Sequence, residues 1–337
     1  MQSAILPLIR QRKEPRHDAF LSPRALTAAG IPFETSVLLR DCTTFRIGGP
    51  AALLCRPHTQ EQLVRTLDIW RTNDGNCPLF ILGRGSNVLF SDNGFPGLVT
   101  CTRDLQEVSL FHAREGTPCL RAGCGALLAA LSRRCVAEAP ALSGLEFACG
   151  IPGTLGGAVV MNAGAHQSEM ANVVRESVCI GRTDGRILTL TNAQHGFSYR
   201  RSVYQLHPEW VLLNATLELS PSDTVTVRAA MERNLASRRK NQPLEYPSAG
   251  SVFRRPAQPD VYVGRLVEDC GLKGFRVGGA EVSEKHAGFI VNRGDATADD
   301  VRRLIAHVQE AVLRAYGIEL KCEVCIVRED GRTEREE

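Results

Sequence analysis

Three glycine-rich loops constrain the fold of this chain more than any other feature of its sequence. They span residues 46–51, 83–87 and 150–158. Glycine in such numbers lets backbone N–H groups approach a ligand without interference from Cβ atoms, and several such groups can point at phosphate oxygens. Plain tight turns use glycine as well, so the spacing alone leaves both interpretations open.

The loop at 83–87 does not have the surroundings of a dinucleotide fingerprint. A strand-like stretch at 44–56 precedes a helix that begins at Thr59, where Gln62 completes a capping box. A strand at 79–82 then enters the loop, and a strand-like segment at 88–90 leaves it. The Rossmann fingerprint needs a glycine motif that opens a helix, so we predict that this is not a Rossmann site.

The rest of the chain mixes strands and helices. Further strands are expected at 98–102, 108–111, 119–122, 173–180, 187–190 and 210–219. Helices are expected at 126–137, at 226–239, and from the cap at Thr297 to a stop at Gly317. A last strand at 318–327 alternates apolar and polar residues, which places Glu323 on its polar face.

Composition and charge exclude several classes of protein. The 337 residues are 43% apolar, enough for two or three compact units. Lys and Arg number 40 against 37 acidic residues, so the formal charge of +3 indicates no nucleic-acid partner. No apolar run reaches the length of a membrane span, and the N-terminal stretch lacks a signal-peptide cleavage site. We therefore expect a cytoplasmic protein without membrane insertion.

The 12 cysteines are scattered singly through apolar segments, which favours reduced thiols. The one C-x-x-C pair, Cys322 and Cys325, falls in the expected last strand, where positions three apart point to opposite faces. No second pair of Cys or His has matching spacing, so we expect no metal site.

Several longer strings, taken in order, resemble one enzyme family. They are ILGRGSN at 81–87, LSGLEF at 142–147, GIPGTLGGA at 150–158, MNAGA at 161–165, YRRS at 199–202, PSAGSVF at 247–253, GLKGFRVGGA at 271–280 and SEKHAGFIVN at 283–292. Together they resemble the UDP-N-acetylenolpyruvoylglucosamine reductase family over roughly residues 43–327.

The resemblance implies an α+β chain with a two-subdomain FAD-binding fold of the vanillyl-alcohol-oxidase (VAO/PCMH) type and a third α+β substrate-binding domain. We expect an N-terminal extension at 1–39, FAD-binding subdomains at 40–102 and 103–220, the substrate-binding domain at 221–318, and a final strand and tail at 319–337. FAD should bind non-covalently, because no histidine attachment motif is apparent. Its expected contacts are Arg46, Gly48, Gly83, Arg84, Gly85, Ser86, Asn87, Gly153, Thr154, Gly156, Gly157 and Ala158.

The family's reaction is a two-stage hydride transfer in peptidoglycan precursor synthesis. NADPH reduces the flavin, and the reduced flavin then delivers hydride to C3 of the enolpyruvyl group of UDP-N-acetylglucosamine enolpyruvate, with a proton added at C2. By resemblance, Arg200, Ser251 and Glu323 carry this chemistry. Hydride addition builds negative charge on the substrate carboxylate, and an arginine supplies a permanent bidentate charge for it.

Ser251 is expected to act as the general acid, a task that suits a hydroxyl only when the neighbouring carbanion is strongly basic. Two roles stay open for Glu323, which either orients Arg200 or hydrogen-bonds the developing enediol as a neutral acid. Without the resemblance, Arg200 would read as a solvated charge, Ser251 as a turn residue and Glu323 as the exposed side of an edge strand.

Tyr199, Lys240 and Arg254 are expected to contact the substrate, and Lys240 and Arg254 would supply the local positive charge that its pyrophosphate needs. The family usually reads Phe-Lys-Asn-Pro after the catalytic serine, whereas here Arg254 and Arg255 occupy the middle positions. The short interval from Arg200 to Ser251 resembles the compact type II branch, in which no lid tyrosine is evident.

Two other readings compete with the reductase. A flavin oxidase of the same superfamily would use oxygen, but no histidine-linked flavin motif supports it. A non-catalytic nucleotide-binding protein would be expected to lose Arg200, Ser251 or Glu323, and all three are present. We expect a monomer whose small-molecule partners are the sugar nucleotide and NADPH.

Overall fold

The first unit is built around a four-stranded sheet of order β1-β2-β5-β3. The computed structural model describes residues 23–72, 77–258 and 260–334. Within this sheet β2, β5 and β3 are parallel and β1 runs antiparallel to β2. The elements of this unit are α1 (Pro23–Ala28), β1 (Phe33–Leu38), η2 (Leu39–Cys42), β2 (Pro50–Cys55), α2 (Gln60–Thr72), β3 (Leu79–Leu82), β4 (Val88–Phe90) and β5 (Phe95–Cys101).

Helix α2 begins where the sequence predicts it. The Gln62 N–H donates to Thr59 Oγ1 at 3.2 Å, while the Gln62 side chain accepts from the His58 N–H rather than from Thr59. Its apolar face buries Leu63 and Leu67 in the core. Strands β2 and β3, which flank α2, both pair in parallel with β5, so β2, α2 and β3 form a β-α-β unit with β5 between its two strands.

The N-terminal boundary differs from the expected extension at 1–39. Strand β1 pairs along its length with β2, and Leu26 of α1 is fully buried against Leu53 and Trp70. Residues 23–39 therefore belong to the first unit, because they cover a sheet edge and part of a core; residues 1–22 lie outside the described residues.

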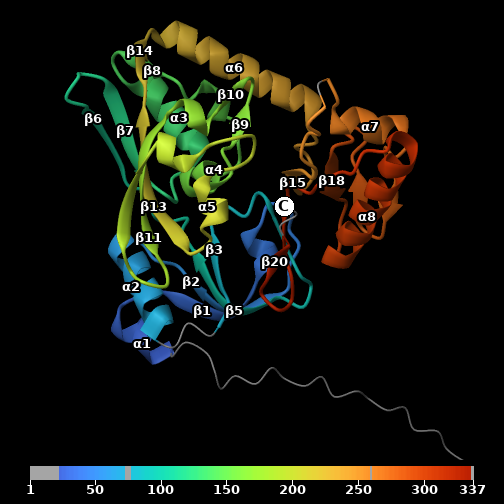
Figure 1. Ribbon diagram of the computed structural model, residues 1–337, viewed down its shortest axis with the longest axis horizontal. Helices are drawn as coiled ribbons and strands as arrows, with labels where there is room; N and C mark the ends of the chain where they lie inside the picture. Colours follow the sequence, from blue (N-terminus) through green and yellow to red (C-terminus); the bar gives the residue numbers. More distant parts are fainter. Residues whose placement is uncertain (1–22, 73–76, 259, 335–337) are drawn as a thin grey trace, which may run out of the picture.

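The second unit is an antiparallel sheet of order β12-β11-β13-β7-β6. Helix α4 packs against its central strands β7 and β13, and α3 lies beside the short β8 (Figure 1). The elements are β6 (Val108–His112), β7 (Pro118–Gly123), α3 (Leu128–Ala137), β8 (Ala141–Ser143), η3 (Glu146–Ala148), α4 (Leu155–Val160), β9 (Gly164–Ala165), β10 (Ser168–Glu169), η4 (Met170–Asn172), β11 (Val174–Gly181), β12 (Ile187–Thr191), η5 (Ala193–His195), α5 (Val203–Leu206), β13 (Trp210–Glu218) and β14 (Ser220–Ser222).

The third unit is reached along α6, which spans the top of the molecule in Figure 1. Its sheet has the order β15-β18-β17-β16; α8 packs on β16 and β17, and α7 packs on α8. The elements are α6 (Thr224–Asn241), β15 (Ser248–Ser251), α7 (Val263–Asp269), β16 (Arg276–Val277), β17 (Ala280–Val282), β18 (Phe289–Asn292) and α8 (Ala298–Tyr316). The capping box of Thr297 with Asp300 and the left-handed Gly317 confirm the predicted ends of α8.

Two expected strands are shorter in the structure. The stretch 44–56 is a strand only from Pro50, because Arg46 and Gly48 both have positive φ angles. The last strand is confined to β19 (Cys325–Val327), which pairs with β4 and with β20 (Thr333–Glu334). The segment before β19 crosses from the third unit to the first, so no single strand runs beside it along its length. Leu320 and Val324 in this segment are nevertheless buried, as the alternation predicts.

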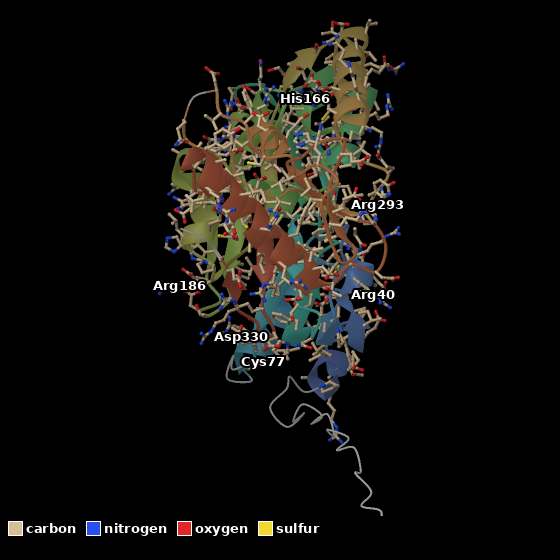
Figure 2. The ribbon with its side chains drawn as sticks, turned by 90° about the vertical axis from the view of Figure 1, so that its right-hand side faces the viewer. Arg40, Cys77, His166, Arg186, Arg293 and Asp330 are labelled. Carbon is tan, nitrogen blue, oxygen red and sulfur yellow. The ribbon has the colours of Figure 1, made fainter. Side chains whose placement is uncertain are left out.

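Direct hydrogen bonds tie the first unit to the third. Thr44 Oγ1 donates to the carbonyl of Ser248 at 2.7 Å, and the Asp92 carboxylate accepts the N–H groups of Ala298 and Asp299 at the start of α8. A cavity of about 1030 Å³ lies at this junction, and Arg40 and Arg293, both labelled in Figure 2, are on its walls. Among the described helices, none is both long and apolar enough to cross a membrane.

Candidate active site

A cleft of about 1930 Å³ opens where the three units meet. Arg200 enters it from the second unit, Ser251 from the third, and Glu323 from the segment that returns to the first. The structure thus brings together three residues that lie far apart in the sequence, as the resemblance implied.

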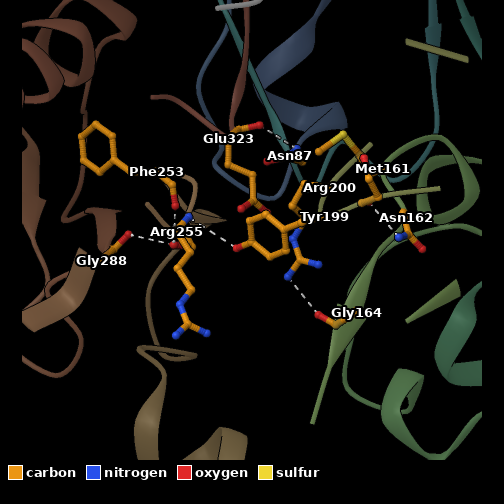
Figure 3. A network of polar contacts seen from close by, with 12 residues as sticks. Asn87, Met161, Asn162, Gly164, Tyr199, Arg200, Phe253, Arg255, Gly288 and Glu323 are labelled. Carbon is orange, nitrogen blue, oxygen red and sulfur yellow. Dashed lines mark hydrogen bonds and ion pairs between the residues drawn. The ribbon is translucent and has the colours of Figure 1, made fainter. Parts of the chain in front are cut away.

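Arg200 sits in a tight turn in which the backbone groups of Ser198 and Arg201 bond to each other. Its φ angle is +56°, a conformation that non-glycine residues rarely adopt. The guanidinium donates from Nε to Glu323 Oε1 at 3.1 Å and from Nη2 to the carbonyl of Gly164 at 3.0 Å (Figure 3). The charge is therefore held in one place against two fixed acceptors.

Glu323 is positioned through its own backbone. Its N–H donates to the carbonyl of Val252 at 2.7 Å, and its carbonyl accepts from Asn87 Nδ2 at 3.1 Å. Burial raises the pKa of the Glu323 carboxyl, and the charges of Arg200 and Arg254 oppose that rise. Asn87, an expected cofactor contact, thereby also joins the loop at 83–87 to the segment that carries Glu323.

Ser251 ends β15 with its hydroxyl poorly engaged by the protein. Oγ lies 3.4 Å from the carbonyl of Phe253 and 3.5 Å from that of Gly288, both long for an O–H···O bond. A hydroxyl held so loosely is available to donate to a ligand in the cleft.

The expected substrate contacts divide into two groups. Arg254 lines the cleft, and its Nε is buried with no hydrogen-bond partner among residues 23–72, 77–258 and 260–334. Tyr199 lies over the Arg200 guanidinium at 5.0 Å and accepts a bond from the Arg255 N–H, so it touches the catalytic group from outside the cleft lining. Lys240 is exposed and does not line the cleft, because it follows Arg238 on a different face of α6.

The glycine loops at 83–87 and 153–157 face each other in close contact, and both line the cleft. A Cβ on Gly83 would lie 2.5 Å from Thr154 Oγ1, so that glycine is required by the packing of the two loops. In contrast, a Cβ on Gly153 or Gly157 would meet nothing closer than 3.8 Å, which leaves room for a ligand against the backbone. This arrangement fits a bound dinucleotide such as FAD. Of the expected cofactor contacts, Arg46, Gly83, Arg84, Gly85, Ser86, Asn87, Gly153, Thr154, Gly156, Gly157 and Ala158 line the cleft.

Gly48 is the exception among the expected cofactor contacts. It packs against Leu39 and Phe90 and lines only the smaller cavity between the first and third units. Its glycine is explained by a φ angle of +134° and by this close approach, since the loop must turn tightly beneath the sheet.

Three polar residues of the cleft were missed by sequence reasoning. Arg103 donates to the carbonyls of Cys42, Gly83 and Arg84 and so holds the loop at 83–87 in place. Arg238 lines the cleft beside Gly150, and burial lowers its pKa. Gln242 has a buried Oε1 without a partner among the described residues. Contacts between residues far apart in the sequence, and buried atoms without a partner, leave no local pattern in the sequence that would reveal them.

Comparisons with known proteins agree with this geometry. Residues 242–327 match the model of the UDP-N-acetylenolpyruvoylglucosamine reductase C-terminal domain, and residues 51–191 match that of an FAD binding domain. A UDP-N-acetylenolpyruvoylglucosamine reductase from Moorella thermoacetica is 49% identical over 282 residues, which cover 84% of this chain and 89% of the relative. One from Caldanaerobacter subterraneus is 45% identical over 287 residues, covering 85% and 91%.

The chain belongs to the UDP-N-acetylenolpyruvoylglucosamine reductase family.

A solved reductase of this family supports the fold. The crystal structure of the UDP-N-acetylenolpyruvylglucosamine reductase from Thermus caldophilus matches with a TM-score of 0.71 and 34% identity, over 88% of this chain and 98% of that one. The expected α+β fold, with an FAD binding domain followed by the family's C-terminal domain, is thereby confirmed. Family membership also removes the support for the competing oxidase reading.

Proposed function

We propose that this chain reduces UDP-N-acetylglucosamine enolpyruvate to UDP-N-acetylmuramate, with NADPH as hydride donor and FAD as the carrier. The observation that carries the proposal is the meeting of Arg200, Ser251 and Glu323 in one cleft with two facing glycine loops, in a chain of the reductase family. When bound, FAD would accept hydride from NADPH and pass it to the enolpyruvyl carbon. The loops at 83–87 and 153–157 would hold this cofactor.

Arg200 would meet the negative charge that builds on the substrate carboxylate. Its guanidinium is already fixed by Glu323 and by the carbonyl of Gly164, so little reorganisation is needed as the charge develops. The 3.1 Å ion pair supports Glu323 as the residue that orients Arg200. The raised pKa of Glu323 keeps its alternative role, as a neutral donor to the enediol, chemically accessible.

Ser251 would deliver the proton to C2 of the substrate, because its hydroxyl has only long contacts within the protein. Arg254 would contact the diphosphate, since its Nε is buried in the cleft wall without a partner in the described part of the chain. A charged ligand satisfies such an atom with a charge-assisted bond.

We also propose that the chain acts as a cytoplasmic monomer with no nucleic-acid partner. The near balance of 40 basic and 37 acidic residues supports the last of these points, because no strong field is present to attract a polyanion. Size-exclusion chromatography with light scattering of the FAD-loaded protein tests the oligomeric state, and a stable dimer would contradict it.

Anaerobic mixing experiments test the reaction. NADPH should bleach the yellow protein, and the enolpyruvyl sugar nucleotide, added next, should restore the colour. Because both ligands must place a reacting carbon over the same flavin, steady-state kinetics should be ping-pong with substrate inhibition. A reduced protein that regains colour with oxygen but not with the sugar nucleotide would refute the proposed function, and intersecting double-reciprocal plots would refute the shared site.

A further inference from the structure

A buried hydroxyl in the second unit bonds to both ends of the segment that presents Arg200. Ser177 lies in the middle of β11, and its Oγ is 2.8 Å from His195 Nε2 and 2.7 Å from the Tyr204 hydroxyl. His195 immediately precedes the segment 196–203 and Tyr204 immediately follows it. Ser177 and His195 are 0% exposed and Tyr204 is 2% exposed.

The directions of these bonds follow from elementary chemistry. His195 Nδ1 lies 2.7 Å from the carbonyl of Thr191, which can only accept, so Nδ1 carries the proton. Burial lowers the pKa of His195, so the ring is neutral and its Nε2 accepts the Ser177 hydroxyl proton. The Tyr204 hydroxyl then donates to Ser177 Oγ. Each polar atom in this chain of bonds has a partner, which is the condition for burying them all.

The segment between these ends is conformationally demanding. Arg200 has a φ angle of +56°, and a strained residue of this kind persists only where its surroundings over-determine the backbone. Within the segment, the Ser198 carbonyl accepts from Asn162 Nδ2 at 2.9 Å, and Ser202 Oγ donates to the carbonyl of Val160 at 2.7 Å. Phe197 stacks on the His195 ring with centroids 4.7 Å apart and planes 2° from parallel.

We propose that Ser177, with His195 and Tyr204, acts as a positioning residue that clamps the 196–203 segment and thereby fixes Arg200 for the substrate half-reaction. Ser177 does not line the cleft, and His195 and Tyr204, which do line it, have their polar atoms engaged by Ser177 and Thr191. None of the three belongs to the ion pair, so we assign them an action through Arg200. This inference rests on the proposed function, because it assigns the clamp to the step that needs the arginine.

Ser177→Ala tests the clamp with almost no change in shape. Displacement of a catalytic group by about 1 Å costs on the order of 10²-fold, so we expect flavin reoxidation by the sugar nucleotide to slow about 10- to 100-fold. Reduction of the flavin by NADPH should stay within about twofold, since Arg200 serves the second half-reaction. Both rates are measured by anaerobic stopped flow and are expressed per bound flavin. A variant that folds or binds FAD less completely can then still be compared with the unsubstituted protein.

Ser132→Ala is the matched control. The Ser132 hydroxyl is 1% exposed and donates to the carbonyl of Leu145 at 2.8 Å, but it lies in α3, away from the Arg200 segment. It should lower stability and leave both rates per flavin unchanged. Tyr204→Phe removes only one of the two bonds and keeps the ring, so it provides a milder variant if Ser177→Ala fails to fold.

Coupling to Arg200 separates positioning from a general structural role. In an Arg200→Lys background the clamp has no arginine to place, so adding Ser177→Ala should change reoxidation by less than about twofold. Hydrogen exchange of residues 196–203 should become about 10-fold faster in Ser177→Ala and stay unchanged in the control, independently of activity.

Three results would each overturn the clamp. The first is an unchanged reoxidation rate in both Ser177→Ala and Tyr204→Phe. The others are an equal slowing of both half-reactions, or additive effects of Ser177→Ala and Arg200→Lys. If the unsubstituted protein itself were not reoxidised by the sugar nucleotide, the proposed function would fail instead. The exchange measurement would still show whether Ser177 holds the segment.

Discussion

Replacing Ser251 with alanine should separate catalysis from stability. The hydroxyl has two contacts, at 3.4 Å and 3.5 Å, both near the outer limit of a hydrogen bond. Removing it should therefore cost less than about 1 kcal/mol of folding free energy. Loss of the proton donor should slow reoxidation of the flavin by the substrate about 10²- to 10⁴-fold, or roughly 3 to 5 kcal/mol of barrier.

Anaerobic stopped flow resolves the two half-reactions of this variant. Bleaching by NADPH should be nearly unchanged, because it needs no proton at the substrate C2, and Ser251→Cys should retain much of the reoxidation rate. Ser283→Ala is the control: its hydroxyl accepts the N–H groups of Lys285 and His286, so its loss should lower the melting temperature and spare the chemistry. Equal slowing of both half-reactions would make Ser251 a structural residue. Rapid reoxidation in Ser251→Ala would move the proton to another donor, with Glu323 the first candidate.

Three further predictions follow from the cofactor loops, the ion pair and the interdomain contact. Acid precipitation should release FAD to the supernatant, and colour kept in the pellet or FMN in its place would contradict non-covalent FAD. The raised pKa of Glu323 means that its contribution to stability is full at low pH and is lost as pH rises through the folded-state pKa. In paired thermal melts Glu323→Gln should therefore gain stability relative to the unsubstituted chain as pH rises above the ordinary range of a glutamate, and a difference that does not change with pH would refute the raised pKa. Asp92→Ala removes the carboxylate that accepts the Ala298 and Asp299 N–H groups and should cost about 1 to 2 kcal/mol in urea unfolding, whereas a loss near zero would show that Thr297 alone caps α8.

Local rules predicted the elements that depend on local chemistry. The ends of α8 follow from Thr297, Asp300 and Gly317, because a capping box and a left-handed glycine act within one turn of the helix. The strands at 79–82 and 88–90 were predicted without error, and with them the absence of a helix after the loop at 83–87. Arg200, Ser251 and Glu323, which line one cleft, were singled out through the family resemblance rather than through periodicity.

Features that depend on distant partners were predicted less well. Residues 23–39 show little periodicity, yet they pack because β2 offers them an edge. The segment at 318–324 alternates like a strand but passes between two sheets, so it forms only a bridge at Cys322. Gly48 was grouped with ligand-binding glycines although it serves a tight turn against Phe90, and glycine has the same sequence signal in both settings.

The two cations expected at the substrate diphosphate are now distinguishable. Arg254 lines the cleft, lies close enough for its charge to oppose the rise in the pKa of Glu323, and has a buried Nε that lacks a partner within the described residues. Lys240 is exposed and outside the lining. We therefore propose that Arg254, rather than Lys240, contacts the diphosphate.

Arg254→Met keeps much of the side-chain volume and removes the charge. Because a hydrogen bond to a charged group contributes about 1.5 to 3 kcal/mol, the KM for the sugar nucleotide should rise about 10- to 100-fold. The KM for NADPH should rise with it if the two ligands share the site. Lys240→Met, which removes only an exposed charge, should change either KM by less than about twofold. Equal effects of the two substitutions, or a larger effect at Lys240, would mean that the end of α6 closes onto the ligand and that the unsatisfied Arg254 Nε is not the diphosphate contact.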